Sequence, residues 1–163
     1  RIVSTLLAEI DGLGSKGQDD LIITIGATNV PWLIDNAILS RFQKRIYVPL
    51  PDAEARQIIL EIFIQRRGHK SQWPLDELVA RTDGYSGREI EQICQTAVTH
   101  MTQRANPELM AMVDKGQEAL QDYEIRIESL SSEDFDVAFK EIKPGSDAEM
   151  LHRYQAWSKQ VEQ

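Results

Sequence analysis

The chain has 163 residues, 42% of them hydrophobic and 27% charged, which is typical of a soluble globular protein with one or two domains. Its net charge of −8 argues against a phosphate-backbone partner, so we expect no nucleic acid among its ligands. The single cysteine, Cys94, excludes an internal disulfide and suits a reducing cytoplasm, and no apolar run reaches the ~20 residues of a membrane span.

Residues 1–13 place apolar side chains at helical spacing, which predicts an amphipathic helix. Its apolar face consists of Ile2, Leu6, Ile10 and Leu13. Glycines at positions 12, 14 and 17 are expected to end it. The string LLAEID within this segment could be mistaken for a strand that ends in metal-binding acids, but the helical spacing favours a helix.

Residues 21–27 form a short isoleucine-rich run, which is typical of a strand buried on both faces of a parallel sheet. Asn29 follows at the expected carboxyl end of this strand, the edge where open α/β sheets bind ligands. Asp35 is a candidate N-cap for a short helix that ends near Arg41. Residues 45–48 predict a second strand. Without further information, Asn29 could equally be a turn residue before a proline, and Arg41 a surface residue that complements the helix dipole.

The rest of the chain is predicted to be helical. The expected helices cover residues 52–66, 74–81, 86–104, 107–123, 132–142 and 147–161. Asp52 is a candidate N-cap for the first, and Ser86 and Glu89 have the spacing of a capping box for the third. The expected buried residues are Ile58, Ile59, Ile62 and Phe63 in the first helix, Ile90, Ile93, Cys94, Ala97 and Met101 in the third, Phe135, Ala138, Phe139 and Ile142 in the fifth, and Leu151, Tyr154, Trp157 and Val161 in the last.

Three strings in this order resemble the second region of homology of AAA ATPases: GATNVPW, SRFQKRIYVPLPD and GYSGREI. The wording is similar to the subfamily that holds the ATPases that disassemble ESCRT-III filaments, katanin, spastin and fidgetin, and it is most like the archaeal cell-division branch. The resemblance implies an α/β fold class. Residues 1–49 would be the C-terminal part of the AAA α/β sheet domain, residues 50–143 a small helical lid, and residues 144–163 a C-terminal helix.

The resemblance also implies catalytic roles for Arg41 and Asn29. Arg41 matches the arginine finger, which reaches the γ-phosphate of ATP held by the neighbouring subunit, and a guanidinium suits this role because it is always charged and forks onto phosphate oxygens. Asn29 matches the sensor-1 residue, whose amide can orient the attacking water. Ser40 departs from the pattern, because the subfamily usually carries an arginine there and a hydroxyl cannot replace that charge.

Four further residues align with positions that surround the adenine and ribose of ATP in the family: Ile59, Phe63, Gly87 and Arg88. An apolar wall suits a purine face, and glycine allows the backbone to approach it closely. The alternative for Ile59 and Phe63 is ordinary lid core, and for Gly87 it is a helix start. The three tryptophans are expected to be packing anchors and not ligand platforms.

Two parts of a nucleotide site have no counterpart here: a G-x-x-x-x-G-K-[ST] phosphate loop and an acid pair for magnesium. The resemblance therefore implies an ATP hydrolase that begins upstream of this chain, with ATP and Mg²⁺ held mainly by residues outside it, and we expect the chain alone to be inactive. No metal site within the chain is predicted, because His69, His100 and His152 have no ligand at suitable spacing.

The first functional hypothesis is a cytoplasmic, ring-forming homo-oligomer, a hexamer, that couples ATP hydrolysis to the remodelling of protein filaments. ESCRT-III-like polymers are favoured as substrate and microtubules come second, with a membrane involved only through the filament. The second hypothesis is a catalytically incomplete interaction module that docks on active AAA subunits. Dinucleotide binding is disfavoured because the sequence lacks G-x-G-x-x-G.

Overall fold

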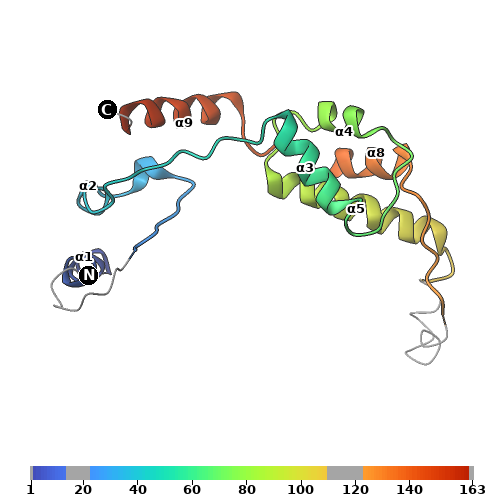
Figure 1. Ribbon diagram of the computed structural model, residues 1–163, viewed down its shortest axis with the longest axis horizontal. Helices are drawn as coiled ribbons and strands as arrows, with labels where there is room; N and C mark the ends of the chain where they lie inside the picture. Colours follow the sequence, from blue (N-terminus) through green and yellow to red (C-terminus); the bar gives the residue numbers. More distant parts are fainter. Residues whose placement is uncertain (1, 14–22, 110–122, 162–163) are drawn as a thin grey trace. The chain divides into compact units, whose positions relative to one another are not determined.

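The computed structural model describes residues 2–13, 23–109 and 123–161, and the chain divides into two compact units (Figure 1). One unit runs to Val48 and takes in the C-terminal helix from Ala148, and the other covers Pro49–Asp147. None of the helices in these ranges is long and apolar enough to cross a membrane.

The first unit contains helix α1 (Ile2–Leu13), the short 3-10 helix η1 (Pro31–Leu33), helix α2 (Asn36–Leu39) and helix α9 (Ala148–Val161). The predicted cap of α2 is confirmed, because the Asp35 carboxylate accepts a hydrogen bond from the backbone N–H of Ala37 at 2.7 Å. Such a bond satisfies one of the backbone donors that a helix start leaves unpaired.

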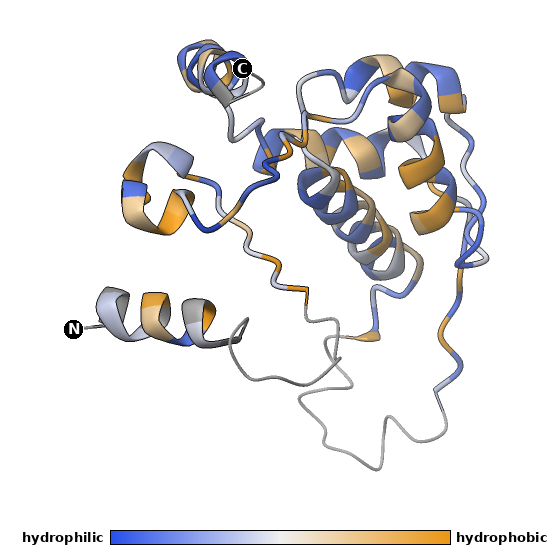
Figure 2. Ribbon diagram, turned by 60° about the vertical axis from the view of Figure 1, so that its left-hand side comes forward, coloured by the Kyte–Doolittle hydropathy of each residue, from blue (hydrophilic) through white to orange (hydrophobic). Residues whose placement is uncertain are grey.

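The strands predicted for residues 21–27 and 45–48 are not formed where the structure describes them. Residues 23–28 and 42–50 lie outside any helix or strand, and Ile25 and Val48 are 87% and 81% exposed; Figure 2 shows hydrophobic residues along this extended stretch. A buried strand needs neighbouring strands to pair its backbone groups. Among the described residues the one β-bridge, Ser71 to Leu130, belongs to the other unit.

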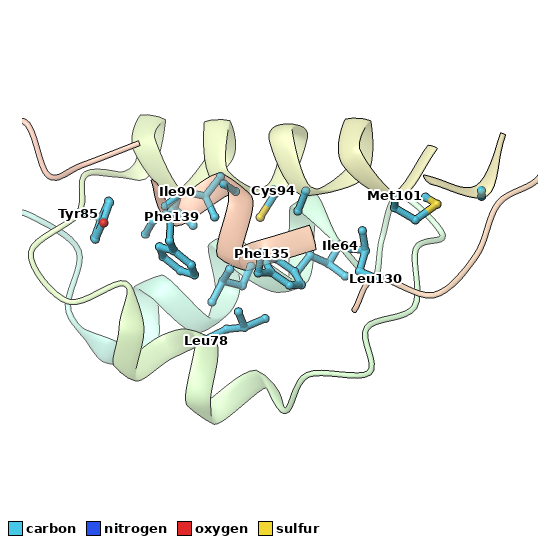
Figure 3. Packing of buried hydrophobic residues seen from close by; sticks show 14 residues of the cluster. Ile64, Leu78, Tyr85, Ile90, Cys94, Met101, Leu130, Phe135 and Phe139 are labelled. Atoms are coloured by element: carbon cyan, nitrogen blue, oxygen red, sulfur yellow. The ribbon is translucent and has the colours of Figure 1, made fainter. Parts of the chain in front are cut away.

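The second unit is a helical bundle made of α3 (Ala53–Phe63), α4 (Leu75–Arg81), α5 (Gly87–Ala105) and α8 (Ser132–Glu141). Helix α5 packs against both α8 and α3, and α3 packs against α4. In Figure 3, Phe135 lies at the centre of the buried cluster, beneath α5. The core residues are Leu60, Ile64, Leu78, Tyr85, Ile90, Ile93, Cys94, Ala97, Met101, Ala105, Leu130, Phe135, Ala138 and Phe139.

The predicted helix starts of this unit are confirmed by their caps. The Asp52 carboxylate accepts from the N–H of Ala55 at 2.8 Å, and Ser86 and Glu89 form both bonds of a capping box. The helix predicted for residues 107–123 falls largely at positions 110–122, which lie outside the described residues.

The apolar face of α3 is rotated from the predicted one. Ile58 is 45% exposed, whereas Leu60 and Ile64, four residues apart on one face, are buried. Every position from 58 to 64 except Glu61 is apolar, so the hydrophobic pattern alone did not single out one face. The helices that pack against α3, which are α4 and α5, decide it, and the partly buried Ile59 and Phe63 pack against the edge of the core.

The Cys94 thiol is buried, as predicted, and burial raises its pKa to about 12. Because the thiolate is the reactive form, we expect a thiol reagent at pH 8 to modify native Cys94 at least ~10³-fold more slowly than the unfolded chain. The measurement is the rate of thiol labelling with and without denaturant. Equal rates in the two conditions would mean that the helix α5 face opens freely.

Candidate functional site

Arg41 directly follows the C-terminal turn of α2. Its guanidinium Nη1 donates to the carbonyl oxygen of Ala37 and to the Ser40 hydroxyl, each at 3.1 Å. The contact with the carbonyl end of a helix is the dipole-complementing role that a surface arginine can play. The side chain is nevertheless exposed, and the fork of a guanidinium carries five donors. An exposed, partly anchored guanidinium of this kind can receive an anion from another molecule.

Ser40, which stands where the resembling subfamily usually has arginine, contacts the neighbouring guanidinium. Its hydroxyl donates to the carbonyl of Ala37 at 2.8 Å and accepts from Arg41 at 3.1 Å. The hydroxyl therefore adds no charge, but it links Arg41 to the last turn of α2. What the serine contributes at this position is orientation of the arginine that remains.

Asn29 lies at an exposed bend just before η1. In this turn it is the Thr28 hydroxyl that accepts from the backbone N–H of Val30, at 3.0 Å. The main-chain carbonyl of Asn29 accepts a hydrogen bond from the hydroxyl of Tyr154, on α9. The backbone of Asn29 is thus held by a residue that is distant in the sequence.

An aromatic cluster surrounds this contact. The Tyr154 ring lies 5.0 Å from the Trp32 ring, tilted by 46°, and 6.2 Å from the Tyr47 ring, stacked at 24°. The guanidinium of Arg153 lies 4.0 Å from the centroid of the Trp32 ring, within the range of a cation–π contact. The prediction that Trp32 is a packing anchor is confirmed.

In the second unit, two of the four residues predicted to contact adenine and ribose lie together. A Cβ added to Gly87 would stand 3.5 Å from Cδ1 of Ile59, so the first turn of α5 faces α3 at this point. Phe63 lies one turn after Ile59, with the guanidinium of Arg67 4.6 Å from its ring centroid. Arg88 is at the start of α5, where its side chain is exposed.

A shallow hollow of about 310 Å³ opens beside Phe63. It is lined by Phe63, Arg67, His69, Cys94, Gln95, Val98 and Thr99. Of the four predicted nucleotide contacts only Phe63 borders it, so this hollow does not unite them. Asn29 and Arg41 belong to the first unit, while these four residues belong to the second.

A buried polar cluster that was not predicted from the sequence joins α5 to α8. Asp134 is fully buried, and its carboxylate accepts from His100 Nδ1 at 2.7 Å and from Arg104 Nε and Nη2, each at 3.2 Å. Ser131 completes a capping box with it. Burial alone would raise the pKa of Asp134, but hydrogen bonds from Arg104, Ser131 and His100 outweigh it and the net pKa is lowered. Only the Ser131-x-x-Asp134 spacing hinted at this cluster in the sequence.

Comparison with known proteins identifies both units. Residues 1–50 match the family model described as ATPase family associated with various cellular activities (AAA), and residues 74–114 match the AAA+ lid domain. Over 96% of its length the chain is 29% identical to the Meiotic spindle formation protein mei-1 of Caenorhabditis elegans and 34% identical to a katanin p60 ATPase-containing protein, of the A-like 1 type, from Sorex araneus. It spans about a third of the length of these curated relatives, 33% and 32% respectively.

Solved structures give the same family. The crystal structure of the FIGL-1 AAA domain in complex with ADP matches 95% of this chain, with a TM-score of 0.72 and 28% identity, and is itself covered to 50%. A structure described as "Structural Basis for Katanin Self-Assembly" matches 81% of the chain, with a TM-score of 0.65 and 28% identity, and is covered to 45%. The predicted resemblance to the katanin, spastin and fidgetin subfamily is confirmed.

Proposed function

Since this chain belongs to the AAA ATPases, we propose that it is the downstream part of a ring-forming ATP hydrolase that remodels protein filaments. Arg41 acts on the γ-phosphate of ATP bound by the adjacent subunit, and Asn29 orients the attacking water. The lid, residues 50–143, closes over the base and ribose of ATP bound by its own subunit. The observation that carries this proposal is the position of Arg41, exposed and anchored at the end of α2.

The residues present fit a nucleotide at the lid. Gly87 has no side chain on the side that faces Ile59, where an added Cβ would stand 3.5 Å from Ile59 Cδ1, so an apolar side chain and a bare backbone lie near each other at the start of α5. This combination suits a purine. The FIGL-1 domain, which this chain resembles, was solved with ADP, which supports a nucleotide as ligand.

ATP would bring Mg²⁺ with it, and the metal supplies charge neutralisation of the phosphates when bound. Within the described ranges no group of three or more His, Cys, Asp or Glu residues could hold a metal ion. The proposed roles of Arg41 and Asn29 are toward the phosphate and the attacking water, and no contact to Mg²⁺ is assigned to either. What this chain provides directly is Arg41, Asn29 and the lid surface.

The substrate is a filament-forming protein. The sequence wording favours an ESCRT-III-like polymer, whereas the relatives named for meiotic spindle formation and for katanin favour a microtubule. A structural neighbour concerned with katanin self-assembly supports a homo-oligomeric ring as the working form.

The test is the ATPase rate of the full-length protein across protein concentration. We expect the rate per subunit to rise steeply over the concentrations at which light scattering detects assembly, because a finger from one copy completes the site of the next. A constant rate per subunit would contradict the shared site. No hydrolysis at any concentration would favour the catalytically incomplete interaction module instead.

The same preparation identifies the substrate. ESCRT-III-like filaments and microtubules are added separately at saturating ATP, and both the ATPase rate and filament length are followed. The cognate polymer is expected to stimulate hydrolysis and to shorten, whereas the other should do neither. If neither polymer changed the ATPase rate or shortened, the proposed ATPase activity would stand but the proposed filament substrate would be rejected.

A further inference from the structure

The C-terminal helix contacts the Asn29 segment through two consecutive residues. Tyr154 donates its hydroxyl hydrogen to the main-chain carbonyl of Asn29, and Arg153 places its guanidinium over the Trp32 ring. Both contacts lie within the first unit. Two neighbouring residues of α9 therefore contact Asn29 and Trp32, which lie on either side of the buried Pro31.

The Tyr154 side chain is itself held in place by rings from two separate parts of the chain. Trp32 lies 5.0 Å and Tyr47 6.2 Å from it, centroid to centroid. Aromatic pairs at these separations attract one another beyond the effect of their buried area. Because these ring contacts limit the movement of the Tyr154 side chain, the hydrogen bond from its hydroxyl restricts the backbone of residue 29.

A main-chain carbonyl fixes the peptide plane that follows Asn29, and that plane limits the directions open to the Asn29 side chain. The other polar group of this peptide unit, the N–H of Val30, donates to the Thr28 hydroxyl. An amide that must orient a water against a phosphate requires placement within about 0.5 Å. Holding both polar groups of the peptide that follows Asn29 restricts the backbone there without touching the side-chain amide.

We propose that Tyr154 is a positioning residue for Asn29, through which α9 sets the rate of ATP hydrolysis and not the affinity for ATP. This inference rests on the proposed role of Asn29. It assigns a mechanistic task to a residue of the C-terminal helix that otherwise has a purely structural explanation, as part of the apolar stripe of α9. The two explanations differ in what they predict for removal of the hydroxyl alone.

Tyr154→Phe removes the hydroxyl and keeps the ring that packs on Trp32 and Tyr47. In the full-length ATPase we expect kcat to fall about three- to tenfold, the worth of one hydrogen bond, with KM for ATP changed less than about twofold. The matched control is Tyr123→Phe in the lid, which removes a hydroxyl bonded to Asn106 Oδ1 at 2.8 Å. The control should leave kcat unchanged, while the thermal midpoint shifts no less than it does in Tyr154→Phe.

A double-mutant cycle separates positioning from packing. In an Asn29→Ala background, Tyr154→Phe should cause no further loss of kcat, because the side chain on which it acts is gone. Full additivity of the two losses, or an unchanged kcat in Tyr154→Phe alone, would overturn the inference and leave the proposed function intact. An Asn29→Ala variant with wild-type kcat would instead remove the proposed role of Asn29, and the inference with it.

Discussion

Replacing Arg41 with alanine is expected to lower the assembly-dependent ATPase rate of the full-length protein by at least about 10³-fold while ADP affinity is retained. The guanidinium offsets negative charge that develops on the phosphate oxygens in the transition state, and a methyl group cannot. In the proposed function the arginine acts on a neighbour's nucleotide, so its loss should leave the subunit's own lid contacts unaltered. The measurements are steady-state turnover above the assembly concentration and a separate titration with ADP.

Arg45→Ala is the matched control for this experiment. Arg45 is also an exposed arginine near the end of α2, and its Nη2 donates to the carbonyl of Leu39 at 3.0 Å. If the role of Arg41 were only to complement the carbonyl end of the helix, the two substitutions would have similar, small effects. Turnover in Arg41→Ala equal to that in Arg45→Ala would therefore remove the finger role.

Helix boundaries were predictable from the sequence because the interactions that set them are local. Asp35, Asp52 and Ser86 each bond a backbone N–H within three residues, and such spacings are visible in a string of letters. The buried face of α3 was not predictable, because apolar residues fill nearly every position from 58 to 64 and the packing of α3 against α4 and α5 selects Leu60 and Ile64.

The predicted strands are not formed because strand formation, unlike helix capping, depends on residues that are distant in the sequence. Residues 23–27 have the composition of a buried strand, yet a strand exists only through hydrogen bonds to another segment. The isoleucine-rich composition predicted a strand, but a strand also requires a partner segment to pair with. Ile23 and Ile25 are 73% and 87% exposed, although apolar side chains of this kind are usually covered in a folded protein.

The candidate site shows the same difference between what local sequence and what distant contacts determine. The family resemblance proposed catalytic roles for Asn29 and Arg41, but it did not indicate which residues support them. Ser40 was recognised as a lost charge, whereas its hydroxyl bond to Arg41 appeared only in the structure. Tyr154 lies 125 residues from Asn29, and nothing in the sequence could have connected them. Resemblance can propose residues for the chemistry, whereas the residues that contact and position them are visible only in the folded chain.

The largest expected effect on stability comes from Asp134→Ala. We expect this substitution to lower the free energy of unfolding of the lid by about 3–5 kcal/mol, because it leaves buried partners of the carboxylate unpaired. Arg104 and His100 on α5 both bond this one side chain, and the capping box of α8 is lost with it. Urea unfolding followed by circular dichroism measures the effect.

Asp136→Ala is the control, two residues further along the same helix. Its carboxylate pairs with Arg81 at 2.7 Å, but the two side chains are 48% and 40% exposed. A solvent-exposed pair contributes about 0–1 kcal/mol, so this variant should unfold nearly as the parent does. Equal decreases in the free energy of unfolding for the two variants would show that the burial of Asp134 adds nothing to its contribution to stability.

The pH dependence follows from the direction of the pKa shift. Folding lowers the pKa of Asp134 through Arg104, Ser131 and His100, so the unfolded chain binds this proton more readily than the folded one. The carboxylate therefore contributes its full stabilisation above the ordinary aspartate pKa of about 3.9, and loses it as the pH falls below that value. Asp134→Asn does not titrate, so its stability should fall less steeply than that of the parent between about pH 4 and 2. Parallel curves for the two proteins over that interval would mean that other carboxylates carry the acid sensitivity of the lid.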